Sequence, residues 1–345
     1  MPESLPHPNP YNSDTNSILY TAYNKCLDLE ARHEQVKRIC FLQVLVCARF
    51  LGYMLLQAPT DGGRKSFGWE IHQCSSDDAI QELAQIYSDH LLRLFYRNKD
   101  HTPTPRSHPS VPSFNFWKQS GLLETTPSKH DKAKKTALYR DGYCCVLSRK
   151  LDSACVNANL VVPKPGDKET VTEVSYIFDR STNENLGNEK KSAYAASAQA
   201  VLSQFGQIRF IEELNGENLH RLENILTLDA VLHQQFDNLM IWLEKIDNDP
   251  NHHQYKLNAI RPSVIDNGVC DKIELTTPDP VKYPLPDPHY LALHAACAQV
   301  VHLSGAGKYI EKVLQDIETI GVLASDGGSD VLYHALVRQQ GVEAY

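Results

Sequence analysis

The stretch LENILTLDAVLHQQFD, residues 222–237, decides the fold that this sequence predicts. It places Asn224 nine residues before His233. In a continuous helix, a rise of about 1.5 Å per residue would separate these two residues by about 13 Å, so they can meet only across a turn. Asp229 is a suitable N-cap, because its carboxylate can accept a backbone N–H of the first helical turn. We therefore expect Asn224 in a strand or loop that folds back against a helix carrying His233.

An apolar stripe at helical spacing predicts the course of that helix. The stripe comprises Leu228, Leu232, Phe236, Leu239 and Leu243. Farther upstream, the apolar runs 143–147 and 160–162 flank a polar turn region. Short apolar runs on either side of a turn predict a β-hairpin, so the expected order is a hairpin, a turn with Asn and a helix with His.

Composition limits the class of protein. The chain has 345 residues, of which 42% are hydrophobic and 22% charged, as is typical of a globular protein with two or three subdomains. The formal net charge of -8 argues against a wholly basic nucleic-acid binder, although a local basic patch can still engage phosphate. Nine scattered cysteines without a CxxC pair favour a reduced intracellular setting. The N-terminus lacks the pattern of a signal peptide, and we expect no membrane span.

Helical spacing of apolar residues marks both ends of the chain. It runs through residues 16–56 and 76–96, and it returns at 289–317. Between residues 97 and 113, four prolines among polar residues predict a linker or an extended arm. We therefore expect a helical N-terminal region (1–97), a Pro-rich linker (98–116), a central module (117–250) and a mainly helical C-terminal extension (251–345).

Four segments together resemble the fungal HNH endonuclease-like proteins, over residues 138–314. These segments are RDGYCCVLSRK (140–150), NLVVPKP (159–165), NGENLHRLENILTLDAVLHQQFD (215–237) and PDPHYLALHAACAQVVHLSGAGKYIEKVL (286–314). The spacing Asn-x8-His-x3-Asp within the third segment is the most specific part of the resemblance. It implies an α+β fold, with a helical N-terminal region, a central ββα HNH-like module and a helical C-terminal extension.

The resemblance also implies a chemistry. In such nucleases a His of the hairpin deprotonates water, and a divalent cation stabilises the developing phosphate charge. By resemblance, Asn224 orients the general base and His233 binds the metal ion. The implied cofactor is Mg, Mn or Zn. We expect it to be weakly held, because His233 is the only secure ligand and affinity depends on ligand number.

The hairpin residue that would act as the base is missing. Where the family reads Ala-His followed by a short apolar run and Pro, this chain has Asn159 between Ala158 and Leu160. An Asn side chain is not basic enough to accept a proton near neutral pH. His220 lies four residues before Asn224 and is a candidate for the same pocket. The sequence therefore predicts a degenerate site that involves Asn159, His220, Asn224 and His233.

Structural alternatives stand beside these roles. His233 could be a helix histidine satisfied by a neighbour, Asn224 a turn former and the basic run 129–150 a solvated face. Three functions remain open: a weak metal-dependent phosphodiesterase, an HNH scaffold repurposed for a small secondary metabolite, or a catalytically silent module that binds nucleic acid or protein. The partner is thus a nucleic acid or a small molecule, and no pattern indicates an oligomeric state.

Overall fold

The computed structural model describes most of the chain. The described residues are 2–92, 95, 130–178, 197–209, 213–214, 216–247, 252–261, 263, 265, 269 and 271–309. The linker expected at 98–116 lies outside them, as does the C-terminal part of the helix expected at 289–317.

The N-terminal part folds into helices. They are α1 (Ser17–Ala31), α2 (Val44–Gln57), α3 (Asp61–Gln73) and α4 (Asp77–His90). Two of them begin at side-chain caps: the Thr60 hydroxyl accepts the Gly63 N–H at 2.9 Å, and the Ser76 hydroxyl accepts the Ala79 N–H at 3.2 Å. Such caps satisfy backbone donors of the first turn. The predicted helical N-terminal region is confirmed.

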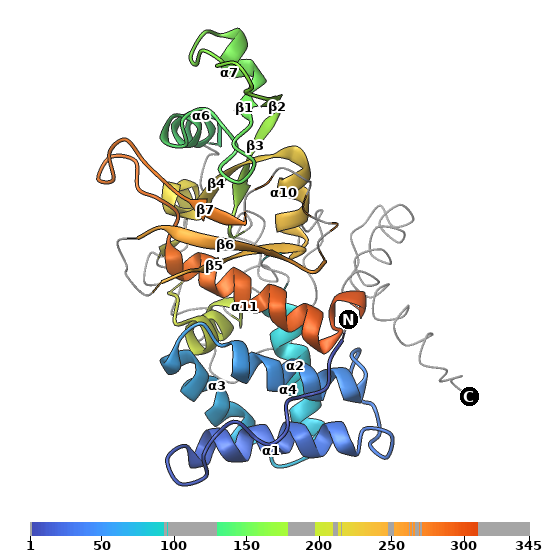
Figure 1. Ribbon diagram of the computed structural model, residues 1–345. Coiled ribbons are helices and arrows are strands. Elements are labelled where there is room, and N and C mark those ends of the chain that lie inside the picture. The colour runs from blue at the N-terminus through green and yellow to red at the C-terminus, as the bar shows by residue number, and fades with distance from the viewer. Residues whose placement is uncertain are drawn as a thin grey trace, which may run out of the picture.

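A long C-terminal helix joins these helices to a sheet. α11 (Pro288–Ser304) packs against α2 on one side and against β5 on the other (Figure 1). The antiparallel sheet consists of β5 (Ile241–Lys245), β6 (Gln254–Ala259) and β7 (Lys272–Glu274). Buried residues of the helices and of this sheet form one large apolar cluster. The C-terminal part thus contributes two strands that the sequence did not predict, and the boundary expected at residue 250 falls between two paired strands.

The central unit is a ββα arrangement. Its strands β3 (Thr172–Tyr176) and β4 (Ile225–Asp229) are antiparallel, with register Thr172↔Asp229 to Tyr176↔Ile225, and α10 (Ala230–Asp237) follows directly. The Asp229 carboxylate accepts the Leu232 N–H at 3.0 Å, so the predicted N-cap is confirmed. Together with the helices at both ends of the described chain, this unit gives the expected α+β fold.

The hairpin prediction was wrong, because the two strands of the ββα unit lie far apart in sequence. Residues 143–147 make only a single bridge, Cys144↔Leu151, and residues 160–162 form no strand. Between these segments the Asp152 carboxylate accepts the Cys155 N–H at 2.9 Å and starts a short helix instead. The first strand of the unit is therefore β3, which pairs with β4 across a long insertion.

The segment before β3 forms an arm at one end of the molecule (Figure 1). It contains β1 (Leu151–Asp152), α7 (Ser153–Asn157) and β2 (Glu169–Thr170), with β1 and β2 parallel. Beside it, α6 (His130–Arg140) packs on the face of the β3–β4 pair that is opposite to α10.

The helix carrying His233 is shorter than the apolar stripe predicted. α10 ends at Asp237, Leu239 has a positive φ of 56°, and Leu243 belongs to β5. The left-handed backbone at Leu239 turns the chain out of the helix and into the sheet. No helix in the described part of the chain is long and apolar enough to cross a membrane.

Candidate functional site

His233 is held between two carboxylates. It lies on α10, where its Nδ1 is 2.6 Å from Glu173 Oε2 of β3 and its Nε2 is 3.1 Å from Asp237 Oδ2, one helical turn along α10. The histidine side chain is 11% exposed, Asp237 is 16% exposed and Glu173 is 46% exposed. Both ring nitrogens thus face a carboxylate oxygen.

These contacts govern the titration of the ring. Burial disfavours the charged imidazolium, but hydrogen bonds and charge attraction from Asp237 and then Glu173 outweigh it, so the pKa of His233 is raised above its usual value. A histidine with a raised pKa holds its proton more firmly and is a poorer base at a given pH. These contacts therefore stabilise the charged ring relative to that of a free histidine.

The strand face opposite His233 carries one further polar group. Alternate residues of a strand share a face, so Ser175 lies on the same side of β3 as Glu173. The buried Ser175 hydroxyl is 3.4 Å from Asp237 Oδ1. Glu173, His233, Asp237 and Ser175 consequently form a continuous polar chain between strand and helix.

Asn224 binds backbone groups through its side-chain amide. Its fully buried side chain accepts the Phe178 N–H at 2.9 Å and donates to the carbonyls of Phe178 and Leu219, at 3.3 and 3.1 Å. These bonds use the amide to hold backbone together at the start of β4. The Asn224 side chain thus binds backbone groups, whereas the His233 ring binds the carboxylates of Glu173 and Asp237, so the two side chains have separate partners.

His220 lies on the other side of the β3–β4 pair. Its Nδ1 is 2.7 Å from the Tyr176 hydroxyl, and the two rings meet edge to face. Tyr176 alternates with Ser175 along β3 and packs on the small apolar cluster under α6. The structure therefore places His220 and His233 on opposite faces of the strand pair.

Asn159 is exposed on the arm. It follows α7 in a turn, with a positive φ of 55°, and its N–H donates to the Val156 carbonyl at 3.0 Å. Asn tolerates this left-handed conformation better than most residues. α7 lies at the outer end of the arm, away from α10 (Figure 1). The structure does not bring Asn159 to His233.

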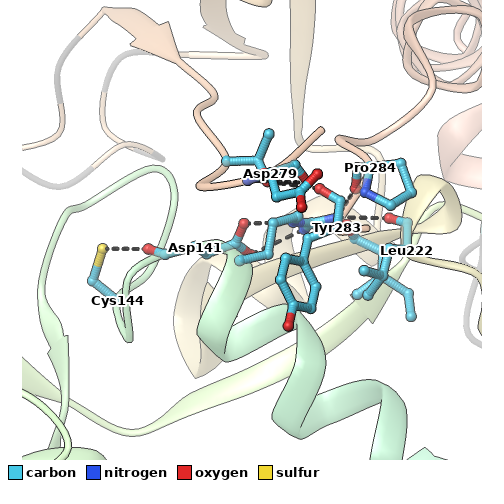
Figure 2. Close-up of polar contacts among 9 residues, drawn as sticks. Asp141, Cys144, Leu222, Asp279, Tyr283 and Pro284 are labelled. Atoms are coloured by element: carbon cyan, nitrogen blue, oxygen red, sulfur yellow. Dashed lines mark hydrogen bonds and ion pairs between the residues drawn. The ribbon is translucent and has the colours of Figure 1, made fainter. Parts of the chain in front are cut away.

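Arg140 and Asp141 form a buried ion pair that also binds backbone carbonyls, and we call this arrangement the Arg140 clamp. The Arg140 guanidinium pairs with Asp141 at 2.7 Å and donates to the carbonyls of Leu222, Ile225 and Pro284, at 2.7, 2.8 and 3.1 Å. Figure 2 shows Asp141 on one side of this group and the Leu222 and Pro284 acceptors on the other, with Tyr283 from the same loop as Pro284. This clamp ties α6 to the start of β4 and to the loop before α11.

Comparison with known proteins gives a match in this central segment. The family model described as HNH endonuclease matches residues 145–244. This part of the chain is HNH-nuclease-like. No curated protein and no solved structure matched the chain. The matched segment contains β3, β4 and α10, so all four members of the polar chain lie within it.

The residues at this site do not fit the divalent ion that the family implies. A histidine ligand offers a ring lone pair to the metal ion, whereas both nitrogens of His233 are directed at carboxylate oxygens. Among the residues that the structure describes, no group of three or more His, Cys, Asp or Glu side chains is arranged to hold a metal ion. The weakly held metal ion that we expected thus has no preformed site in the described part of the chain.

Two residues that contact His233 were not predicted as site residues. Asp237 belongs to the His-x3-Asp spacing that carries the resemblance, and this spacing places it on the same helix face as His233. Glu173 gave no such signal, because it is 60 residues from His233 and reaches it only through strand pairing.

Proposed function

We propose that this chain is an HNH-nuclease-like protein that binds nucleic acid without hydrolysing it. The observation that carries the proposal is the pairing of both His233 nitrogens with carboxylates, in a unit whose first strand presents Glu173 and Ser175 to the helix. Base-catalysed, metal-assisted hydrolysis uses one neutral His as the base and another as the metal ligand, and this unit lacks that pair.

A basic and aromatic surface supports nucleic acid as the partner. On α6, Lys135 is exposed and precedes the 45% exposed Tyr139 by one helical turn. The Tyr139 ring lies 4.9 Å from the Tyr283 ring, and Lys282 Nζ is 5.2 Å from the Tyr283 centroid. Lysines neutralise phosphates and tyrosine rings stack on bases. The acidic chain as a whole would repel nucleic acid, so binding requires a local surface of this kind.

Fluorescence anisotropy with labelled single-stranded and duplex DNA tests the binding. Lys135→Glu should weaken the affinity several-fold and lower the slope of log affinity against log salt by about 1. Lys272→Glu is the matched control, because it makes the same charge change at an exposed position of β7. Equal affinities of the two variants, or no binding by the wild type, would contradict the proposal.

Plasmid nicking with magnesium or manganese tests the lack of hydrolysis. We expect wild type and Asn159→His to nick no faster than a buffer blank, because residue 159 lies on the arm, away from His233. EDTA serves as the control for metal dependence. Nicking that EDTA and His233→Gln both abolish would instead establish a metal-dependent phosphodiesterase.

A further inference from the structure

Each ring nitrogen of His233 lies within hydrogen-bond distance of a carboxylate oxygen. An ionised carboxylate only accepts hydrogen bonds, and a neutral imidazole has one N–H and one lone pair. With Glu173 at 2.6 Å from Nδ1 and Asp237 at 3.1 Å from Nε2, a neutral ring would direct its lone pair at one of the two carboxylates. Both contacts are satisfied together when both ring nitrogens carry a proton.

In these surroundings, the two carboxylates are the groups that balance the positive charge of the ring. On the same face, Glu173 and Ser175 stand opposite Leu228 and Leu226 of β4, so the second strand offers only apolar side chains. The Ser175 hydroxyl can donate to Asp237, at 3.4 Å, and extends the chain without adding charge. Strand and helix therefore contribute one carboxylate each, with the ring between them.

We propose that the His233 imidazolium is the resident cation of this ββα unit and joins Glu173 on β3 to Asp237 on α10. It supplies the positive charge that the family resemblance assigns to a divalent ion bound by His233, and it ties the helix to the strand through charge-assisted hydrogen bonds. The unit keeps the ββα arrangement while a side chain of its own supplies the positive charge.

Nuclear magnetic resonance of the full chain with nitrogen-labelled histidine reads the ring directly. At neutral pH, long-range proton–nitrogen correlations should show both His233 nitrogens in the protonated form, with the signal assigned by its loss in His233→Gln. An excess of magnesium or zinc should leave that signal unchanged. A neutral tautomer in the wild type, or a metal-dependent shift of the signal, would overturn the inference.

Thermal unfolding and calorimetry give readouts that do not depend on activity. Glu173→Gln and Asp237→Asn should each lower the Tm by at least about 2 °C, because each removes one charged partner. His252→Gln is the matched control: it disrupts a pair with Asp247 at 3.2 Å, in which the histidine is 61% exposed, and should leave the Tm unchanged. Stoichiometric zinc binding that disappears in His233→Gln would refute the inference. The outcome is independent of nucleic-acid binding, because these measurements concern the ring and the fold alone.

Discussion

At the residue scale, the buried Asn224 side chain supplies hydrogen bonds to backbone groups that would otherwise need partners from a strand or helix. Its amide satisfies both backbone groups of Phe178, just beyond β3, and the carbonyl of Leu219. No water can replace those partners at a side chain that is fully buried. The residue therefore closes the open end of the β3–β4 pair.

Replacement of Asn224 should consequently affect stability. We expect Asn224→Ala to lower the free energy of unfolding by about 2–3 kcal/mol, because it leaves buried backbone groups without partners. Asn159→Gly is the control: the position is exposed, and Gly tolerates its positive φ, so the change should stay within about 0.5 kcal/mol. Urea unfolding measures both variants, and equal losses would contradict the assignment of Asn224.

His294 titrates in a way that should be visible in the whole protein. It is stacked on Phe236 of α10, with ring centroids 3.8 Å apart, and burial lowers its pKa to about 3 from a usual 6.5. Because the pKa of His294 is lower in the folded chain, the unfolded chain binds a proton at pH values where the folded chain does not. Its contribution to stability is therefore lost as pH falls below about 6.5.

The expected pH profile follows from this sign. Between pH 6.5 and pH 5 the wild type should lose about 1–2 kcal/mol more stability than His294→Leu, since a full proton difference is worth about 1.4 kcal/mol per pH unit. Urea unfolding at several pH values gives the comparison. Parallel profiles for the two proteins would show that His294 does not titrate as the structure implies.

At the scale of elements, the Arg140 clamp sets the position of α6. The guanidinium is buried with Asp141 and reaches carbonyls from two other parts of the chain. A planar group with five donors can make all these bonds at once, whereas an ammonium group cannot.

Loss of the Arg140 clamp should strongly lower the stability of the fold. We expect Arg140→Ala to lower the free energy of unfolding by about 3–5 kcal/mol, because the Asp141 carboxylate would stay buried without its partner. Arg140→Lys should recover only part of this loss. Hydrogen exchange should show weaker protection at the first residues of β4 in both variants, and full recovery by Lys would contradict the clamp.

At the scale of the whole molecule, α11 makes the N-terminal helices and the sheet of β5, β6 and β7 depend on each other. It packs on α2 and on β5, and its buried residues belong to the same apolar cluster as those of both regions. Apolar surface on both sides of one helix cannot be buried by either region alone.

We therefore expect the fragment 117–345 to lack independent stability. Without α2, the apolar face of α11 would be open to water, so the fragment should aggregate or unfold without a cooperative transition. The full chain should unfold in a single calorimetric transition. A monomeric fragment with its own sharp transition would show that the expected boundary at 98–116 separates independent domains.

The sequence alone determined the features that depend on a few neighbouring residues. The helices of the N-terminal region, the Asp229 cap and the order of strand and helix at residues 222–237 all follow from caps and short apolar periods, which act within a turn or two. The degenerate centre predicted at Asn159 stays a prediction, and the structure places this residue just after α7 on the arm.

Only the tertiary structure decided which residues meet His233. Strand pairing across a long insertion brings Glu173 to a histidine 60 residues away, and it leaves Asn224 and His220 with other partners. A one-residue shift of that register would turn Glu173 and Ser175 to the opposite face. Local propensities do not specify this register; burial of the two faces against α10 and α6 does, because each face must cover apolar surface contributed from elsewhere in the chain.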